Sequence, residues 1–371
     1  SSGGRTVSLE ITRRRDCGCR LLERLVNIDS GSYCKAGIDA CGQILAAELS
    51  ALGFQTEILP ETDRGSHVRA LRPGTAGPEV FLSGHLDTVW PEGIAAQRPF
   101  RNDGRLLWGP GVGDMKGGIV LMLYALKALQ AEGVQTGPVS VFLCGDEELG
   151  SVRGRPHIEA LARRASCVLV VEGSVPPCTA VIRRWGVGAF RLLVQGRAAH
   201  VLDAQGGGVN ACRELALKVL ALEDLSDAAG GTRVSVNVVL GGSARQVTAG
   251  EARAEVDVRV RDAAAVSALE QAVRRTAETP ALRGASCTLS GQMTRPPMQP
   301  NDRTQALLAL AEEVGTEVGS PVVAGEKAGG SDGSFAAALG VATLDGMGPL
   351  GYDMCGEQER IESDCLVPRS L

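Results

Sequence analysis

The hydrophobic positions in the first half of the chain follow two patterns, one typical of helices and one typical of buried strands. Short apolar runs of strand length occur at residues 80–83, 139–144 and 167–171, and each ends in a turn with glycine or an acidic residue. Helical spacing is found between residues 21 and 52 and again at 117–132. Apolar strands that alternate with helices predict an α/β domain with a mostly parallel central sheet.

From about residue 182 the pattern changes to strands in which apolar and polar residues alternate. These strands are expected at 190–194, 234–239 and 251–260, with helices at 209–225 and 263–278. Two helices and about four strands would form a small α+β layer with a ferredoxin-like arrangement.

A helix expected at about 303–318, followed by a glycine-rich stretch, then resumes the first pattern. With 371 residues the chain exceeds the size at which one hydrophobic core usually stops growing. The sequence therefore predicts one domain formed by residues 1–181 and 298–371, interrupted by an inserted domain at residues 182–297.

Composition narrows the class of protein. Hydrophobic residues make up 44% and charged residues 22% of the chain, which is typical of a globular enzyme. The net charge of −5 and the pI of about 5.6 do not support nucleic-acid binding, which needs a basic face. No apolar run has the roughly 20 residues of a membrane span, and the first sixteen residues lack the apolar stretch of a signal peptide.

The eleven cysteines are an odd number spread along the whole chain, which favours a reducing compartment over a disulfide framework. We therefore expect a cytoplasmic protein with no nucleic-acid or membrane partner.

Candidate chemistry begins at the end of the first apolar strand. His85 and Asp87 are two residues apart, so in an extended segment their side chains project from the same face. Further acids follow the other apolar strands: the pair Glu147 and Glu148, and then Glu172. The carboxyl ends of parallel strands are where such sheets bind ligands.

A second kind of signal is Asp114, which lies in the glycine-rich stretch 108–118. A two-zinc hydrolytic site needs nitrogen and carboxylate ligands, one bridging carboxylate and a nearby base. Adjacent acids such as Glu147 and Glu148 diverge, so one can bind metal while the other acts as a general base. Each signal alone is most often a capping residue or a solvated turn, but together at successive strand ends they favour a metal site.

Several motifs resemble those of the dizinc metallopeptidases that include glutamate carboxypeptidase, acetylornithine deacetylase and aminoacylase. The resemblance covers about residues 21–361 and is closest to the glutamate carboxypeptidase branch. The motifs are Gly84-His-Leu-Asp-Thr-Val, Gly113-Asp-Met-Lys-Gly-Gly, Gly145-Asp-Glu-Glu-Leu-Gly-Ser, Val171-Glu-Gly, Gly196-Arg-Ala-Ala-His200 and Gly329-Gly-Ser-Asp-Gly.

The resemblance implies a ligand set. His85 and Glu172 would hold one zinc ion, Glu148 would hold the other, and Asp114 would bridge both. Asp87 would orient His85 and fix its tautomer. The fold implied is a zinc-exopeptidase-like catalytic domain with an inserted lid and dimerisation domain.

The resemblance also implies roles outside the metal ligands. Glu147 would be the general base and acid, and His200, in the inserted domain, would stabilise the tetrahedral oxyanion, often across a dimer. Arg295 would bind the terminal carboxylate of the substrate as a bidentate partner. Gln246, where relatives usually carry an asparagine, and Gly330, in the last of the motifs, would also contact the substrate.

The chain departs from the family at the last ligand of the second zinc, where relatives carry a histidine and this chain has Cys355. Three alternatives follow. Cys355 binds zinc as a thiolate, or Asp353 or water takes the place and leaves a weak second site, or the protein holds one zinc or none and is inactive. No nearby histidine can replace it, because the chain has only His67, His85, His157 and His200. His67 and His157 are expected at the surface.

The sequence thus predicts a zinc-dependent hydrolase, expected to hold two Zn²⁺ ions per chain, that cleaves an amide bond next to a free carboxylate. Its partners would be a small peptide or N-acyl amino acid and a second copy of the chain, bound through the inserted domain. The alternatives are an N-acyl-amino-acid deacylase of the same family and a non-catalytic relative that binds such ligands.

Overall fold

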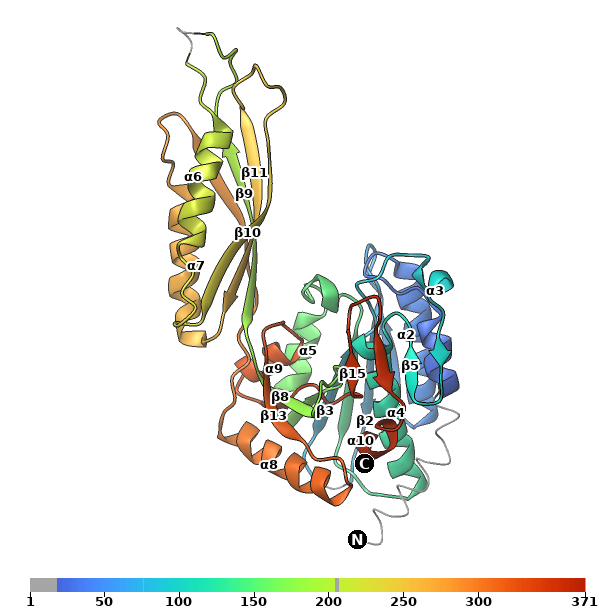
Figure 1. The fold of residues 1–371 in the computed structure, drawn as a ribbon. Helices are drawn as coiled ribbons and strands as arrows, with labels where there is room; N and C mark the ends of the chain where they lie inside the picture. The colour runs from blue at the N-terminus through green and yellow to red at the C-terminus, as the bar shows by residue number, and fades with distance from the viewer. Residues whose placement is uncertain (1–18, 76, 204–206, 371) are drawn as a thin grey trace. The chain divides into compact units, whose positions relative to one another are not determined.

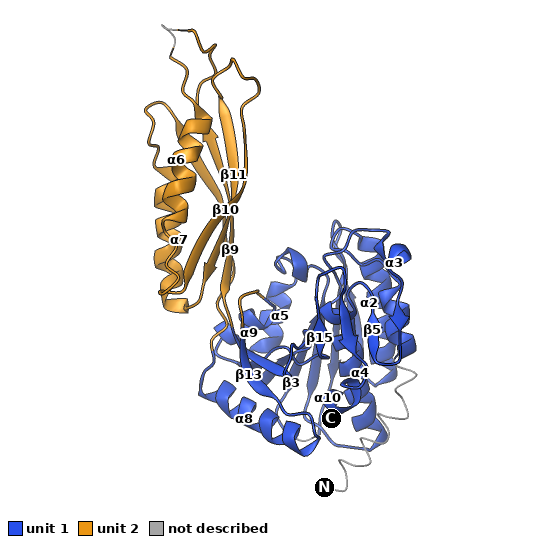
Figure 2. Ribbon diagram, in the orientation of Figure 1, with its two compact units in different colours: residues 1–183, 300–326, 331–371 blue, residues 184–299, 327–330 orange. Residues whose placement is uncertain are grey.

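The computed structural model describes residues 19–75, 77–203 and 207–370. The first sixteen residues, which lack the apolar stretch of a signal peptide, lie outside these residues. The chain forms two compact units, shown in different colours in Figure 2. The first unit comprises residues 1–183, 300–326 and 331–371, and the second comprises residues 184–299 and 327–330.

The first unit is built around a six-stranded sheet with the order β1-β2-β6-β3-β7-β14 (Figure 1). Strands β6, β3, β7 and β14 run parallel, whereas β1 and β2 are antiparallel to their neighbours. The prediction of a mostly parallel α/β sheet is confirmed. The strands are β1 (Gln55–Leu59), β2 (His67–Arg72), β3 (Val80–His85), β6 (Val139–Cys144), β7 (Cys167–Val170) and β14 (Ala342–Leu344).

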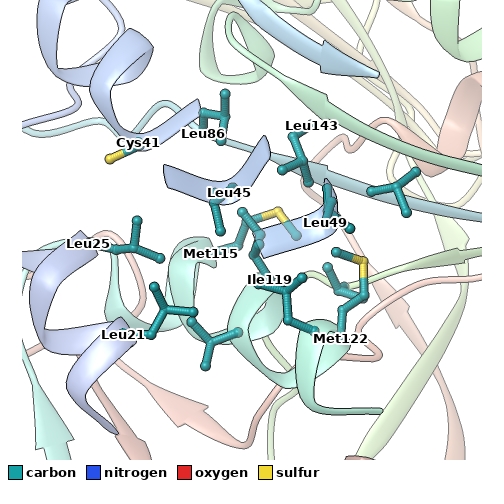
Figure 3. Packing of buried hydrophobic residues seen from close by; sticks show 14 of the residues in the cluster. Leu21, Leu25, Cys41, Leu45, Leu49, Leu86, Met115, Ile119, Met122 and Leu143 are labelled. Carbon is teal, nitrogen blue, oxygen red and sulfur yellow. The ribbon is translucent and has the colours of Figure 1, made fainter. Parts of the chain in front are cut away.

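Helices cover both faces of this sheet, which explains why its central strands are apolar almost throughout. On one face α2 and α4 enclose a core that includes Leu45, Leu49 and Ile119 (Figure 3). On the other face Phe81 and Phe142 pack in a second cluster with residues of α5 and α9. The helices are α2 (Lys35–Ala51), α3 (Ile94–Gln97), α4 (Gly117–Ala131), α5 (Arg155–Ala162), α8 (Asp302–Glu317), α9 (Gly333–Ala338) and α10 (Leu366–Ser370).

The first turn of α4 lies unusually close to the end of β7. A Cβ atom at Gly118 would lie 1.8 Å from the carbonyl oxygen of Val171, so only glycine permits this approach. The contact holds the loop before α4, which carries Asp114, beside the segment that carries Glu172. The packing of α4 against the end of β7 therefore helps to position two of the candidate site residues.

The second unit has the element order β9, α6, β10, β11, α7, β12 and a four-stranded antiparallel sheet, β10-β11-β9-β12. Both helices pack against one face of the sheet, so side chains along β11 alternate between exposed and buried. This is the ferredoxin-like arrangement that the pattern predicts. The elements are β9 (Gly186–Gln195), α6 (Ala211–Glu223), β10 (Thr232–Gly241), β11 (Glu251–Val260), α7 (Ala263–Glu278) and β12 (Ser286–Arg295).

Smaller sheets complete the structure. One has the order β15-β16-β5-β4, and the loop between β15 and β16 carries Cys355; another pairs β8 with β13. Among the described residues, no helix has the length and apolar character required to cross a bilayer. The strands are β4 (Arg101–Asn102), β5 (Leu106–Trp108), β8 (Thr179–Arg184), β13 (Val323–Lys327), β15 (Gly351–Tyr352) and β16 (Arg360–Glu362).

Candidate metal centre

The five predicted metal ligands come from five places in the first unit and meet at the carboxyl edge of its sheet. His85 is the last residue of β3, Glu148 lies in the turn η2 (Glu147–Leu149) after β6, and Glu172 follows β7. Asp114 lies in the segment η1 (Val112–Lys116), at a kink where its own backbone is not helical, and Cys355 follows β15. Because β6, β3 and β7 are adjacent, the residues that follow them converge.

The first group of ligand atoms surrounds the buried imidazole of His85. Its Nε2 atom lies 3.0 Å from Asp114 Oδ1 and 3.2 Å from Glu172 Oε1. Its Nδ1 atom lies 2.9 Å from the carbonyl oxygen of Asp87, a geometry in which Nδ1 carries the proton and donates it. Nε2 is then left to face the two carboxylates as a potential metal ligand.

The second group lies on the other side of Asp114. The Sγ atom of Cys355 is 2.9 Å from Asp114 Oδ2, and Glu148 completes a set whose ligand atoms all lie within 4.8 Å of one another. Glu148 Oε1 is buried and has no hydrogen-bond partner among the residues that the structure describes. Asp353, the alternative to Cys355, instead accepts the N–H of Gln358 at 2.8 Å. The structure thus brings Cys355, and not Asp353, to the group.

Burial and like charge dominate the electrostatics of this cluster. Burial, with Asp114 and Glu147 nearby, raises the pKa of Glu148 to about 9. Burial and the Asp114 carboxylate also raise the pKa of Glu172. Burial alone would lower the pKa of His85, but Glu172 and hydrogen bonds to its neighbours raise it well above its usual value. Such a cluster favours cations, which offset the cost of burying several negative charges.

The side chains fit a pair of zinc ions. Imidazole nitrogen, carboxylate oxygen and thiolate sulfur are all ordinary zinc donors. Each group supplies three protein ligands, with Asp114 common to both, which leaves a coordination position for water or substrate. The unpartnered Oε1 of Glu148 lies where a cation would satisfy it. Two zinc ions could therefore be held by His85, Asp114 and Glu172 on one side and by Asp114, Glu148 and Cys355 on the other.

Asp87 is fully buried and holds the turn that carries Glu147 and Glu148. Its Oδ1 accepts the N–H of Glu147 at 2.9 Å, and its Oδ2 accepts the N–H of Glu148 at 3.1 Å and the hydroxyl of Ser32 at 2.8 Å. The carboxylate lies 3.6 Å from His85 Nδ1, farther than the carbonyl oxygen of Asp87 itself. The contact that orients His85 is thus mainly a backbone contact, while the carboxylate positions the adjacent acids.

Glu359 is a residue at this centre that the sequence patterns do not single out. Its carboxylate is 2% exposed and accepts four N–H groups: those of Gly111 at 3.0 Å, Gly113 at 2.9 Å and Asp114 at 2.9 Å, and the indole N–H of Trp90 at 3.1 Å. Three of these donors are backbone N–H groups, which almost every residue type has, so the sequence does not reveal them as partners. Glu359 therefore fixes the loop that presents Asp114.

Four predicted residues lie in the second unit, at two different ends of it. His200 is exposed, and the adjacent Val201 donates its N–H to the carbonyl oxygen of Gln246 at 3.1 Å, so these two predicted residues are neighbours. Arg295 is buried at the end of β12, where a Cβ atom at Gly330 would lie 2.4 Å from its Cδ.

Strand β9 separates these two pairs. Arg295 pairs with Val187 near the start of β9, whereas His200 follows Gln195 at its end. The eight residue steps from Val187 to Gln195 span roughly 26 Å at the rise of a β-strand.

The expectation that His67 lies at the surface is wrong, because its side chain is completely buried. Its Nδ1 accepts the N–H of Gly145 at 2.9 Å, and it lies in a group with Cys144 and Asp146. Asp146 in turn accepts the thiol of Cys144 at 3.1 Å and the N–H of Arg153 at 2.7 Å. These contacts identify the group as a hydrogen-bonded support for the turn after β6.

Ligand atoms grouped on both sides of one aspartate, at the carboxyl edge of an α/β sheet, are features of the dinuclear metallopeptidases, a class of hydrolases. The peptidase family M20/M25/M40 matches residues 81–370, and the chain belongs to this family. It is thus a hydrolase of the metallopeptidase class.

Individual relatives agree with this assignment. The chain is 29% identical over 357 residues to carboxypeptidase G2 of Pseudomonas sp. (strain RS-16), covering 95% of this chain and 86% of the relative. It is 30% identical over 334 residues to a succinyl-diaminopimelate desuccinylase of Alkalilimnicola ehrlichii, covering 84% and 85%. Its fold is similar to that of YXEP of Bacillus subtilis, described as a dinuclear metal-binding peptidase, with a TM-score of 0.72, 16% identity and coverage of 97% and 96%.

The raised pKa values predict how the metal-free protein responds to pH. In the unfolded chain Glu148 titrates near 4.5, but in the folded metal-free protein it titrates at about 9. The stabilisation from its bound proton is therefore complete below pH 4.5 and lost as the pH rises toward 9, and His85 acts in the same direction. We expect the chelated protein to melt at least about 5 °C lower at pH 9 than at pH 6.

Saturating Zn²⁺ should remove most of this difference, and chelated Glu148→Gln should show a smaller one. Differential scanning calorimetry of the chelated and zinc-loaded proteins measures the effect. Equal slopes against pH in both states would contradict the prediction.

Proposed function

We propose that this protein is a zinc-dependent hydrolase that cleaves an amide or peptide bond next to a free carboxylate, as a glutamate carboxypeptidase does. The observation that carries the proposal is the two-sided contact of Asp114, whose Oδ1 faces His85 and whose Oδ2 faces Cys355. A carboxylate with different ligand groups on its two oxygens is the arrangement that a pair of ions needs. The similarity to carboxypeptidase G2 along most of the chain supports the same reaction class.

Glu147 is the proposed general base and acid. When bound, the zinc ions supply Lewis-acid chemistry at the scissile carbonyl and at the attacking water. Glu147 lies in one group with His85 and Glu148, whose ligand atoms are all within 4.8 Å of one another. Its carboxylate is therefore close enough to take a proton from that water and deliver it to the leaving amine. The bond from its N–H to Asp87 holds it in this position.

Arg295 is the proposed partner of the free carboxylate of the substrate. A guanidinium group binds a carboxylate through two parallel hydrogen bonds, which fixes its orientation as well as its charge. Gly330 permits the close packing of the Arg295 side chain, because any side chain at that position would meet it. His200 and Gln246 are proposed to stabilise the oxyanion that forms on the scissile carbonyl.

These roles require two copies of the chain. His200 and Arg295 lie at opposite ends of β9, roughly 26 Å apart along the strand. One amide bond and its adjacent carboxylate are much smaller than that distance. We therefore infer a homodimer in which one copy supplies Arg295 and its partner supplies His200 to the same site.

The proposed dimer contact is the β10 edge of the second unit. β10 is an edge strand, and it exposes Val238, Val239 and Leu240 by 42%, 53% and 49%. The adjacent helix α6 exposes Leu217 by 40% and Leu220 by 65%. An edge strand with apolar side chains is a template for pairing with a second copy.

We further propose that the protein works in a reducing compartment such as the cytoplasm. All ten described cysteines are free thiols, and a thiolate role for Cys355 needs reducing conditions.

The first test is the general base. Glu147→Gln should lower kcat by about 10²- to 10⁴-fold while the zinc content per chain stays at the wild-type value, because the ligands are unchanged. Hydrolysis of N-acyl-glutamates and metal analysis by mass spectrometry measure the two quantities. The exposed Glu313→Gln is the matched control, and a fully active Glu147→Gln would refute the assignment.

The second test concerns Cys355. We expect about two zinc ions in the wild type, about one in Cys355→Ser, and two again with higher kcat in Cys355→His, because a neutral imidazole leaves the ion a stronger Lewis acid than a thiolate does. In the cobalt-substituted protein, thiolate coordination gives a near-ultraviolet absorption band, which both variants should lose. A band that persists in Cys355→Ser, or two tightly held ions in that variant, would exclude Cys355 as a ligand.

The third test concerns the two-copy site. His200→Ala and Arg295→Ala should each lose activity by about 100-fold or more. In a mixture that exchanges subunits, half of the dimers are hybrids with one intact site of two, so about a quarter of the wild-type activity should return. The double variant carrying both substitutions should recover nothing when mixed with Arg295→Ala. A lack of recovery in proven hybrids would show that one copy supplies both residues.

A further inference from the structure

The loop between β15 and β16, residues 353–359, carries the proposed ligand Cys355. Asp353 and Cys355 both have a left-handed backbone, with φ angles of 50° and 62°. This conformation is uncommon for residues other than glycine. Contacts with the surroundings are therefore needed to hold the loop in the shape that directs the Cys355 thiol to Asp114 Oδ2, 2.9 Å away.

Met354 anchors the loop on the side that faces the metal centre. A Cβ atom at Gly173 would lie 2.3 Å from the Sδ of Met354, and one at Gly113 would lie 3.1 Å from its Cγ. Gly113 directly precedes Asp114 in the chain, and Gly173 directly follows Glu172. Met354 thus packs against both segments that carry these proposed ligands.

The base of the loop is held by a row of arginine and aromatic side chains. Arg101 of β4 pairs with Trp108 of β5, which also pairs with Arg360 of β16. Arg360 in turn pairs with Tyr352 of β15. The guanidinium of Arg101 lies 4.4 Å from the ring centroid of Trp108. That of Arg360 lies 5.0 Å from the centroid of Trp108 and 5.2 Å from that of Tyr352, so cations and rings alternate across four strands.

Arg360 is the member of this row that connects it to the interior of the loop. Tyr352 directly precedes the loop and Arg360 directly follows it, so their contact clamps its two ends. Arg360 also donates from Nη1 to the carbonyl oxygen of Gln358 at 2.8 Å. Gln358 then donates its N–H to Asp353 Oδ2 at 2.8 Å. A continuous set of contacts therefore joins the row of rings to the first residue of the loop.

We propose that Arg360 and Asp353 are positioning residues for Cys355, and that they set the metal affinity of the site formed by Asp114, Glu148 and Cys355, the second site. The inference rests on the proposed function, in which Cys355 is a ligand of the second zinc ion. A loop that is held in place before the ion arrives avoids the entropy cost of becoming ordered on binding. Contacts that orient metal ligands commonly contribute roughly 10- to 100-fold to metal affinity.

The first test removes the guanidinium of Arg360. Cobalt titration of the metal-free protein, followed by the thiolate absorption band, measures the affinity of the second site. Arg360→Gln should weaken this affinity by about tenfold or more. Arg101→Gln is the matched control, because it removes a guanidinium from the same ring of Trp108 but from a strand that does not border the loop. Its cobalt affinity should equal that of the wild type, and equal losses in both variants, or none in Arg360→Gln, would overturn the inference.

The second test compares two substitutions of Asp353. Asp353→Ala removes the acceptor of the Gln358 N–H and should weaken the second site by about tenfold or more. Asp353→Asn keeps an acceptor oxygen and a residue type that tolerates the left-handed backbone, so its cobalt affinity should stay close to the wild-type value. A loss in both variants would make the carboxylate itself the important group, and no loss in either would remove the loop contact from the argument; both results contradict the inference.

A double variant separates positioning of Cys355 from general support of the fold. In Cys355→Ser, only the site formed by His85, Asp114 and Glu172 should bind an ion tightly. Arg360→Gln added to this variant should leave the affinity of that remaining site unchanged, because the loop has no ligand left to present. A clear further decrease would show that Arg360 supports the whole metal centre and would refute its specific role.

These measurements need no turnover, so the inference and the proposed reaction can fail separately. If the cobalt affinities follow the expected pattern but no N-acyl-glutamate is hydrolysed by the zinc-loaded wild type, the positioning role stands and the proposed reaction fails. If hydrolysis occurs but the cobalt-loaded wild type has no thiolate band, the reaction stands and the positioning role fails.

Discussion

The structure depends on how the first unit accommodates a cluster of buried acids around Asp114. Glu148, Glu172 and the thiol of Cys355 all lie close to this carboxylate, and burial beside like charges raises the pKa values of Glu148 and Glu172. Such a cluster is costly in a low-dielectric interior unless cations neutralise it. The energetic cost of the metal-free site is thus the source of its affinity for metal, and the surrounding fold has to hold the acids in place against their mutual repulsion.

Two further buried carboxylates supply that restraint, and both act through backbone N–H groups. Asp87 binds the N–H groups of Glu147 and Glu148, and Glu359 binds those of the loop that ends at Asp114. Charge-assisted bonds to backbone donors fix the direction of the chain without adding a mobile cationic side chain. Glu359 also accepts the indole N–H of Trp90, so one carboxylate fixes both the loop of the proposed bridging ligand and the position of Trp90. Two segments that are far apart in the chain are therefore held by the same buried carboxylate.

The second unit contributes its candidate residues at two opposite ends. The ferredoxin-like layer is long along β9, and the residues proposed to bind carboxylate and oxyanion lie at its two extremes. A single elongated layer cannot bring both to one bond, whereas a two-fold pair can, because an isologous contact places one end of each copy near the opposite end of its partner. On this proposal activity depends on assembly, and therefore on protein concentration, as well as on metal.

Sequence by itself determined the elements and the chemistry of the residues. Apolar periodicity predicted the mostly parallel sheet, the strand at 251–260 and the helix at 263–278, because burial on one or both faces sets these patterns. Acidic residues at the ends of the strands predicted a metal site, because the carboxyl ends of parallel strands lie at the same edge of the sheet. Only the tertiary structure showed Glu359 on backbone donors, the buried His67, and Cys355 rather than Asp353 beside Asp114. These contacts join segments that are far apart in the chain, often through backbone groups. A residue pattern shows neither which distant segments meet in space nor which backbone group a side chain binds.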